Sequence, residues 1–374
     1  MNTKGVSMNV IRWGILGTGY AATQFAQGLR ALPEAQLLAV GSRQLQTAQT
    51  FAHQFKIERS YQGYEQLVAD KDIDIVYIAT PNILHKDHCL LALEAGKAVL
   101  CEKPFTINAQ QAREVVDYAR QKQVFCMEAM WTRFIPLWQQ VRTLIQSGQL
   151  GEIKLLLADL SMQLERDPQS RHFNPQVGGG VLLDLGVYLV AIAFDLLGEP
   201  LHISSQGVIG SSQVDEQAAL IFHYPQGELA VLSSSFVTHT PNEAIISGTQ
   251  GQIRIHAPLY RPFQYALTSF APPTTPKVTT SNPGWKTALK QNPWVRSAYD
   301  IYLAPRLKRT AKQFTVPYHG NGYHYQAAEA MHCVTQGLYE SPLMPLEETI
   351  MILEAMDTIR AQWQFQFPSE VKQS

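Results

Sequence analysis

A glycine-rich segment near the start of the chain has the residue types and spacing to hold phosphate groups. It follows the apolar run Val10–Leu16, precedes a predicted helix, and reads Gly17, Thr18, Gly19, Tyr20, Ala21, Ala22. The glycines permit a tight turn and close backbone approach, and the alanine at 22 lets the helix pack on the strand. Free N–H groups at the helix start would face the phosphates. An ordinary strand–turn–helix is the alternative, but this placement favours a site for a dinucleotide pyrophosphate.

The end of the second predicted strand, Gln36–Gly41, indicates which dinucleotide binds. NAD enzymes usually carry an acidic residue about 20 residues after the glycines, where it bonds the ribose 2′-hydroxyl. Here Ser42 and Arg43 occupy that place. A guanidinium and a hydroxyl would bind a 2′-phosphate, which a carboxylate would repel. The sequence therefore favours NADP over NAD, although Arg43 could also stack on adenine in either cofactor.

Further polar residues follow two later strands of the same half. The predicted strand Ile73–Ala79 ends at Thr80, Pro81, Asn82 and, near the next helix start, His85; the strand Ala98–Cys101 ends at Glu102, Lys103 and Pro104. Open α/β sheets bind ligands at the carboxyl ends of their strands. These residues are therefore candidates for cofactor contact, with a surface position at a helix terminus as the alternative for His85.

The element pattern predicts two domains. Strands alternate with helices of ordinary length up to about residue 130, which is typical of βαβ units and a parallel sheet. From Gly151 the strands follow one another with short turns, which indicates a largely antiparallel sheet. We therefore predict an α/β chain, with a doubly wound Rossmann domain at 1–130 and an α+β domain at 131–374, for which substrate binding and dimerisation are implied only by the family resemblance given below. The latter has a large, mostly antiparallel open sheet.

Composition excludes several classes of protein. The chain has 374 residues and a formal net charge of -1, so no electrostatic attraction to nucleic acid is expected. No long uncharged apolar segment suggests a membrane span. Met1 or Met8 could be the native start. The scattered cysteines lack the spacing of a metal site and fit buried thiols in a cytoplasmic protein: Cys89, Cys101, Cys126 and Cys333.

The segment 257–315 differs from the rest because it is rich in proline, aromatic and basic residues. A solvated loop with some interface contacts is the simplest interpretation. A lid over the cleft with Trp285 and Trp294 as aromatic walls is a second. Weak membrane association is a third, although Pro293 and Pro305 interrupt its amphipathic pattern.

Together these motifs resemble the glucose–fructose oxidoreductase / inositol dehydrogenase (Gfo/Idh/MocA) family. The resemblance rests on GTGYAA at 17–22, TPNILH at 80–85, CEKP at 101–104 and GGGVLLDLGVY at 178–188. The runs MEAMWTRFIP at 127–136 and GQLGEI at 148–153 are similar to dimeric dihydrodiol dehydrogenases and NADP-dependent D-xylose dehydrogenases. The resemblance to the family covers the Rossmann half of the chain and much of the second domain.

The resemblance implies roles for individual residues. Lys103 would lie between nicotinamide and substrate, Tyr188 would exchange the proton, and Asp184 would orient the substrate or hold Lys103. Glu102 would fix the strand end, and Pro104 would be cis. Lining the nicotinamide and substrate side would be Glu128, Trp131 and Arg133.

The chemistry of these residues is compatible with the implied roles. Positions 184 and 188 share a helix face, and a cation such as Lys103 would lower the pKa of a phenol. The alternatives are a core tyrosine at 188, a structural carboxylate at 184 and interface packing at Trp131.

The prediction is an NADP(H)-dependent oxidoreductase that moves a hydride between nicotinamide and a secondary alcohol or carbonyl of a sugar, polyol or trans-diol. No metal is required, since the cofactor carries the hydride. A homodimer or higher homo-oligomer is expected from the family. The alternative is an NADP-binding regulatory or scaffold protein without turnover.

Overall fold

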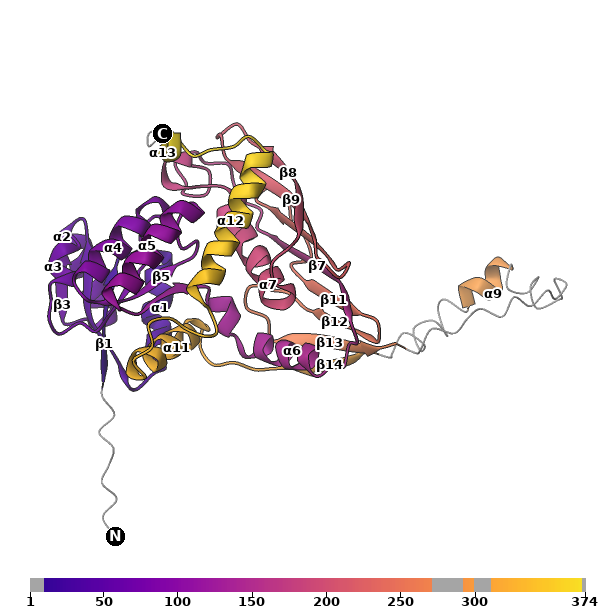
Figure 1. Ribbon diagram of the computed structural model, residues 1–374, viewed down its shortest axis with the longest axis horizontal. Coiled ribbons are helices and arrows are strands. Elements are labelled where there is room, and N and C mark those ends of the chain that lie inside the picture. The colour runs from indigo at the N-terminus through magenta and orange to yellow at the C-terminus, as the bar shows by residue number, and fades with distance from the viewer. Residues whose placement is uncertain (1–9, 271–291, 299–310, 372–374) are drawn as a thin grey trace, which may run out of the picture.

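The computed structural model describes residues 10–270, 292–298 and 311–371. Figure 1 shows two sheets, with the first sheet and its helices on one side and the second sheet on the other. The two candidate start residues, Trp285, Pro305 and most of the basic residues of 257–315 lie outside the described residues. The chain therefore has the predicted α/β composition, with one largely parallel and one largely antiparallel sheet.

The first sheet has the strand order β3-β2-β1-β4-β5-β6, and all of its pairs are parallel. Order reverses between β1 and β4, which is the position where doubly wound sheets bind ligands. The strands are β1 (Ile11–Leu16), β2 (Ala35–Ser42), β3 (Arg59–Gln62), β4 (Ile75–Ile78), β5 (Ala98–Glu102) and β6 (Cys126–Ala129). Sequence analysis missed β3, because its four residues are mostly polar and carry no strand pattern.

The crossover helices of this half alternate with the strands, as the element pattern predicted. Each buries an apolar face against the parallel strands, which are themselves buried on both faces. They are α1 (Tyr20–Leu29), α2 (Leu45–Phe55), α3 (Glu65–Val68), α4 (His85–Glu94) and α5 (Ala109–Lys122). Their amino ends lie at the carboxyl edge of the sheet, so the candidate cofactor residues gather there.

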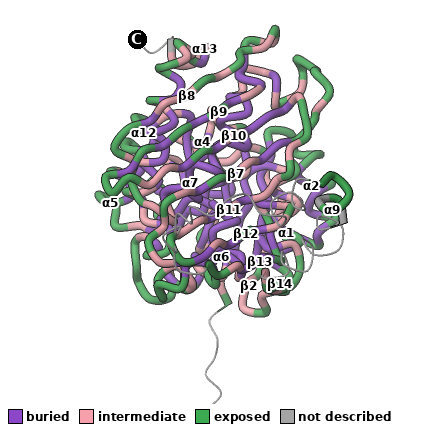
Figure 2. The backbone as a smooth tube through the Cα atoms, turned by 90° about the vertical axis from the view of Figure 1, so that its right-hand side faces the viewer, coloured by how far each residue is buried: buried purple, intermediate pink, exposed green. Residues whose placement is uncertain are grey.

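The second sheet has the order β14-β13-β12-β11-β7-β10-β9-β8, and only its β7–β10 pair is parallel. Its strands are β7 (Ile153–Ser161), β8 (His202–Ile209), β9 (Asp215–His223), β10 (Leu229–Ser235), β11 (Ala244–Gly248), β12 (Gly251–Ile255), β13 (Gln264–Ser269) and β14 (Lys312–Thr315). One face points toward the parallel half, and Figure 2 looks at the opposite face.

The segment 257–315 is not simply a solvated loop. Strands β13 and β14 extend the sheet beyond β12, with Tyr265 stacked on Phe314 at a ring-centroid distance of 4.9 Å. The short helix α9 (Pro293–Ala298) carries Trp294, whose exposed fraction is 84%. The interpretation as a loop is therefore wrong for β13 and β14. The prolines elsewhere in the segment made these two short strands hard to recognise in the sequence.

The helices between the two sheets form the core of the second half (Figure 1). An 18-residue window within Pro175–Leu197 has a mean hydropathy of 2.1, high enough for a membrane span, yet 83% of it is buried inside the structure. It contains a π-helical turn (Leu182–Gly186) and α7 (Val187–Leu197). The helix is apolar because it packs beneath β7 and β10, not because it faces lipid.

The carboxyl-terminal helices return to the first half of the chain. Helix α11 (Tyr323–Thr335) packs on α1, and α12 (Leu346–Gln362) contacts α5, α7 and β8. Two short helices complete the description, α6 (Pro136–Gln146) after the parallel sheet and α13 (Pro368–Val371) at the end. Helices α11 and α12, near the end of the chain, therefore pack against elements of both halves.

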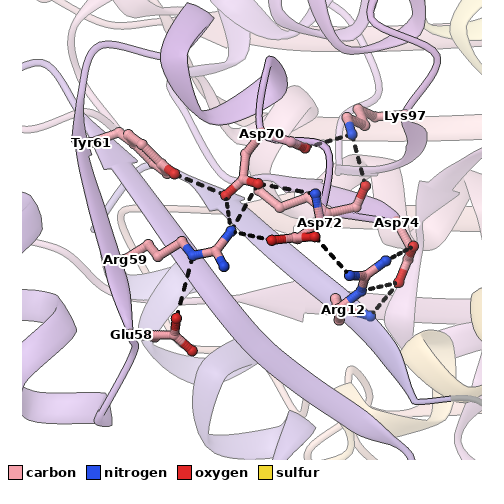
Figure 3. A network of polar contacts seen from close by, with 9 residues as sticks. Arg12, Glu58, Arg59, Tyr61, Asp70, Asp72, Asp74 and Lys97 are labelled. Atoms are coloured by element: carbon pink, nitrogen blue, oxygen red, sulfur yellow. Dashed lines mark hydrogen bonds and ion pairs between the residues drawn. The ribbon is translucent and has the colours of Figure 1, made fainter.

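A charged network joins strands at the amino edge of the parallel sheet (Figure 3). Arg12 pairs with Asp72 and Asp74, and Arg59 pairs with Asp70 and Asp72. Lys97 donates to the backbone oxygens of residues 70 and 73 at 2.6 and 2.9 Å. This network lies at the edge opposite the strand ends that carry the candidate site, so its role is structural.

Candidate active site

A cleft of about 580 Å³ opens where the carboxyl edge of the parallel sheet faces the inner side of the second sheet. Most predicted site residues line it: Gly17, Thr18, Gly19, Tyr20, Ala21, Ser42, Arg43, Thr80, Pro81, Asn82, His85, Glu102, Lys103, Trp131, Asp184 and Tyr188. Three predicted residues do not, namely Ala22, Glu128 and Arg133. One cavity thus brings together residues that lie as far apart in the sequence as Gly17 and Tyr188.

The glycine turn has the geometry of a phosphate cradle. Gly17 has φ +104, and a Cβ there would lie 2.5 Å from the Ala79 carbonyl oxygen, so only glycine fits. A Cβ on Gly19 would meet no atom within 4 Å, which leaves open space where a ligand would lie. Gly19 precedes α1, whose first N–H groups have no side-chain cap. Ala22 is fully buried beneath the turn. These features fit a pyrophosphate at the start of α1.

The adenosine end of the cleft is formed by Ser42, Arg43 and Tyr64. Ser42 is buried at the end of β2, whereas Arg43 is exposed at the cleft rim. Burial raises the pKa of Tyr64, while the positive charge of Arg43 acts in the opposite direction, so the two side chains lie near each other. A guanidinium beside a hydroxyl and an aromatic ring fits a phosphorylated ribose and an adenine.

His85 is a fully buried residue, so the interpretation as a surface histidine is wrong. Its Nδ1 lies 2.8 Å from the Pro104 carbonyl oxygen and its Nε2 lies 2.8 Å from that of Thr80. Burial lowers the pKa of His85. A neutral imidazole donates to one of these carbonyl oxygens and packs against the other, so His85 lies between the ends of β4 and β5 and holds the loops that carry Thr80 and Lys103.

Lys103 lies at the centre of the reacting end. Its Nζ donates to the Asp184 carbonyl oxygen at 2.7 Å and to Asp184 Oδ1 at 3.0 Å. The same Nζ lies 4.6 Å from the centre of the Tyr188 ring. The Lys103–Pro104 peptide is cis. One of the three ammonium donors thus remains for a ligand in the cleft.

Burial and charge shift the pKa values of these groups in different directions. Burial raises the pKa of Tyr188 to about 12, although the Lys103 charge pulls it down. Burial opposes ionisation of Asp184, but Lys103 and Arg171 outweigh it and hold the pKa of that carboxyl below its usual range. Burial lowers and Asp184 raises the pKa of Lys103, with a net increase. At neutral pH the cluster therefore holds a carboxylate, an ammonium and a neutral phenol.

The segment that carries Asp184 and Tyr188 is not a regular α-helix throughout. Asp184 lies in the π-helical turn, and Tyr188 lies in the first turn of α7. A Cβ on Gly180, with φ +121, would lie 2.1 Å from Asp215 Oδ1, so the chain must have glycine there. The buried Asp215 accepts the Leu182 N–H at 2.6 Å. This contact fixes the start of the turn, and π-helical turns are frequent at functional sites.

Trp131 forms an aromatic wall beside the phenol. Its Nε1 donates to the Tyr188 hydroxyl oxygen at 2.9 Å, and its ring stacks on Tyr323 at 4.8 Å. Tyr260 meets Trp131 edge-on at 6.1 Å. The tryptophan therefore packs between the two halves of the chain and also touches the candidate reacting group.

Glu102 and Glu128 support the loop of Lys103 from behind. Glu102 accepts a short hydrogen bond from the Tyr77 hydroxyl, and burial raises its pKa to about 7. Glu128 accepts from the Phe105 N–H and the Thr349 hydroxyl, each at 3.1 Å. Burial raises the pKa of Glu128 to about 7 as well. Glu128 is thus placed to position this loop and is separated from the cleft, contrary to the expectation of direct substrate contact.

Arg133 also lies away from the cleft, so the expected cofactor contact does not fit its position. Its guanidinium pairs with Glu348 at 2.6 Å and with Asp195 at 2.9 Å. Arg142 pairs with the other Asp195 oxygen at 2.6 Å. This buried network joins α6, α7 and α12. A motif shared with a family identifies the segment but not which of its side chains faces the cavity.

Several cleft residues were not predicted from the sequence. They come from loops and from the last third of the chain, and include Arg171, Asn174, Tyr260, Arg261, Asn321 and Tyr323. No motif or spacing marks them. Asn82 ties one of these loops to the cofactor side, because its amide donates to the Gly178 carbonyl oxygen at 3.2 Å. His324, next to Tyr323 in the chain, is buried and does not line the cleft.

Comparison with known families gives the class of this protein. Residues 11–130 match the family described as "Oxidoreductase family, NAD-binding Rossmann fold", and residues 138–254 match the "GFO/IDH/MocA C-terminal domain". The chain belongs to the GFO/IDH/MocA family, as the sequence motifs predicted, and is an oxidoreductase of the sugar and diol type.

Individual relatives narrow the comparison to one branch. The chain is 32% identical to trans-1,2-dihydrobenzene-1,2-diol dehydrogenase of Xenopus tropicalis over 361 residues, covering 96% of this chain and 99% of the relative. The Mus musculus protein of the same name is also 32% identical, with the same coverage. A solved 3-ketoreductase from Actinomadura kijaniata, in complex with TDP-benzene and NADP, has the same fold. It has a TM-score of 0.76 and 24% identity, covering 94% of this chain and 98% of that one.

Proposed function

We propose that this protein is an NADP(H)-dependent oxidoreductase that transfers a hydride between nicotinamide and a secondary alcohol or carbonyl of a sugar, polyol or trans-diol. The observation that carries the proposal is the grouping of Lys103, Asp184 and Tyr188 in the same cleft as the glycine turn. The dihydrodiol dehydrogenases are related over nearly the whole chain, which supports a diol or polyol substrate.

The residues of the cleft supply proton transfer and orientation. The nicotinamide accepts or gives the hydride at C4 when it is bound. In the reductive direction, Tyr188 Oη gives its proton to the carbonyl oxygen of the substrate. The Trp131 N–H already donates to the Tyr188 hydroxyl oxygen, so the phenol hydrogen is free to point at the substrate. The same N–H stabilises the phenolate that forms after proton transfer. Lys103, held by Asp184, polarises the carbonyl and adds positive charge beside the phenolate.

The direct test is NADP(H) turnover on a panel of aldoses, polyols and trans-diols, with the wild type beside Tyr188→Phe. Oxidation or reduction that depends on Tyr188 supports an enzyme. The competing proposal, a regulatory or scaffold protein, predicts NADP binding without turnover, unchanged by the substitution.

The cofactor preference rests on Ser42 and Arg43 and gives a separate prediction. Arg43→Asp is expected to lower the NADP/NAD ratio of kcat/KM by about 10- to 100-fold, because one charge-assisted bond is lost and a repulsive charge is added. The measurement is steady-state kinetics with both cofactors and one substrate. Arg113→Asp, on the outer side of α5, removes a surface arginine in the same way and should leave the ratio unchanged. An unchanged ratio in Arg43→Asp would refute the assignment of NADP.

A homodimer through the outer face of the second sheet is also proposed. Leu157, Val231 and Ile221 pair side by side across β7, β10 and β9, and each is exposed by 36 to 40%. Figure 2 looks onto this face. A contiguous apolar patch in water is unfavourable, and a twofold axis would bury it against its own copy.

Val231→Asp is therefore expected to convert a dimer into a monomer, because a carboxylate would be buried opposite its symmetry mate. The measurement is molar mass by light scattering after size exclusion. Leu201→Asp, an equally large change at an exposed site before β8, is the matched control and should not alter the mass. A wild-type monomer at micromolar concentration would remove this proposal. The four cysteines are free and buried, which suits the proposed cytoplasmic location.

A further inference from the structure

Two arginines at the reacting end of the cleft have no role in the proposed hydride transfer. Arg171 and Arg261 both line the same cavity as Lys103 and Tyr188. They come from different walls, Arg171 from the loop before Asp184 and Arg261 from the turn between β12 and β13. Neither belongs to the glycine turn or to the Ser42–Arg43 corner, so the pyrophosphate and the 2′-phosphate do not account for them.

Most hydrogen-bond donors of the Arg171 guanidinium are not used by the residues that the structure describes. Its Nη1 donates to Asp184 Oδ1 at 3.1 Å, the same oxygen that Lys103 Nζ contacts at 3.0 Å. Within the described chain, no other hydrogen bond is made by its guanidinium. The side chain of Arg171 is 59% exposed, against 12% for that of Lys103. Since a guanidinium has five N–H donors, most of them face the open cleft.

Arg261 lines the same cavity from a different element, the turn between β12 and β13. Its guanidinium carbon lies 5.5 Å from the centre of the Tyr260 ring, and that ring meets Trp131 at 6.1 Å. Trp131 in turn donates to the Tyr188 hydroxyl. The Arg261 side chain forms neither a hydrogen bond nor an ion pair with any residue that the structure describes. The stacking contact holds the cation at the rim, and none of its donors is used by the residues that the structure describes.

The charges at this end do not balance. Among the described residues that line this end, Lys103, Arg171 and Arg261 are positive, and Asp184 is the carboxylate that two of them share; Glu102, whose pKa burial raises to about 7, adds only part of a negative charge at neutral pH. Glu102 lies deeper, hydrogen-bonded to Tyr77. A bound oxidised nicotinamide ring would add a further positive charge. In a partly enclosed cavity, uncompensated charge of one sign favours a ligand of the other sign.

We propose that the substrate carries an anionic oxygen group, a carboxylate or a phosphate, which Arg171 and Arg261 bind from the two walls while the reacting CH–OH lies at Tyr188. The inference rests on the proposed function and narrows its substrate to acidic polyhydroxy compounds, such as sugar acids or sugar phosphates. Guanidinium groups match both anions through paired N–H donors. Arg171 would move the N–H donor that now contacts Asp184 to the anionic group of the substrate. Lys103 would keep the Asp184 carboxylate paired.

The test compares matched neutral and anionic substrates. NADPH formation is measured with a neutral hexose, its uronate, its 6-phosphate and a neutral trans-diol, so that the carboxylate and phosphate sources are distinguished. We expect at least one anionic member to have a kcat/KM about 10-fold or more above its neutral counterpart. Arg171→Gln and Arg261→Gln should each lower the anionic-to-neutral ratio of kcat/KM by about 10- to 100-fold, mainly through KM.

The ratio matters because Arg171 also touches Asp184, so its substitution can slow every substrate equally without changing the ratio. Arg261 has no contact with Asp184, so the kcat/KM ratio of its variant tests the anion subsite independently. Arg113→Gln, with the same loss of charge on the outer side of α5, is the matched control and should leave the ratio within about 2-fold.

The outcomes separate the two proposals. Turnover of neutral substrates with no advantage for anionic ones, or a ratio insensitive to both arginines, would reject this inference and leave the oxidoreductase proposal standing. If no member is turned over, binding to the NADP complex is measured for the same panel by calorimetry. Equal affinity for neutral and anionic members, or none for either, then rejects the anion subsite. Stronger anion binding that is lost in both glutamine variants supports it even though the panel lacks the reacting alcohol.

Discussion

Lys103→Met is expected to reduce kcat by about 10³-fold or more while NADP affinity changes little, because the lysine acts on the reacting groups. The ammonium lies 4.6 Å from the Tyr188 ring centre and bonds Asp184. Methionine fills the space of the lysine stem up to Cε and removes the charged Nζ. The phenolate would lose its electrostatic partner, and the substrate carbonyl would lose its polarising donor.

The same substitution should cost stability. The side chains of Lys103 and Asp184 are only 12% and 11% exposed, so the variant leaves a largely buried carboxylate with Arg171 as its remaining cation partner. Breaking one partner out of a buried pair typically costs about 3–5 kcal/mol. The kcat of the variant must therefore be calculated from the concentration of folded protein. The unfolding midpoint and NADP binding are measured first to determine that concentration.

Lys97→Met provides a matched control for a buried lysine. Lys97 donates to two backbone oxygens at the opposite edge of the parallel sheet (Figure 3), so its loss should lower stability and leave kcat per folded molecule unchanged. Lys103→Arg covers the case in which the methionine variant does not fold, since it keeps the charge but changes its place. A folded Lys103→Met enzyme with full activity would overturn the assignment.

Local signals in the sequence predicted most of the residues of the first half that the structure brings into the cleft. The glycine turn, the Ser42–Arg43 corner and the ends of β4 and β5 each follow from a few adjacent residues, because the turn and helix start determine their own geometry. His85 shows the limit of such reasoning. Its place in the motif could be predicted, but its burial between two backbone carbonyls depends on a loop 19 residues away.

The substrate half depended on the resemblance and on packing. Asp184 and Lys103 are 81 residues apart, and no spacing rule predicts their contact. The structure places Arg133 away from the cleft, because the 3₁₀ turn at Trp131–Phe134 directs Trp131 into the cleft and Arg133 toward α12. Arg171 and Tyr260 carry no local signal, since their loops meet the cleft only after the second sheet has formed.

The second large effect concerns the phenol. Tyr188→Phe removes the proton donor while keeping the ring against Lys103, so kcat in both directions should fall by about 10²- to 10⁴-fold with little change in NADP affinity. Tyr224→Phe is the matched control, because Tyr224 is also buried but lies outside the cleft. Its activity should equal that of the wild type.

The pH dependence gives the same residue a second signature. Burial raises the pKa of Tyr188 to about 12, so the phenol is protonated throughout the neutral range. Carbonyl reduction uses the protonated form and should therefore lack a Tyr188-dependent rise between about pH 6 and 9. Alcohol oxidation uses the phenolate, whose fraction grows about tenfold per pH unit below the pKa, so log kcat/KM should rise with a slope near one. The residual oxidation by Tyr188→Phe should lose that slope; if the slope persists, another group accepts the proton.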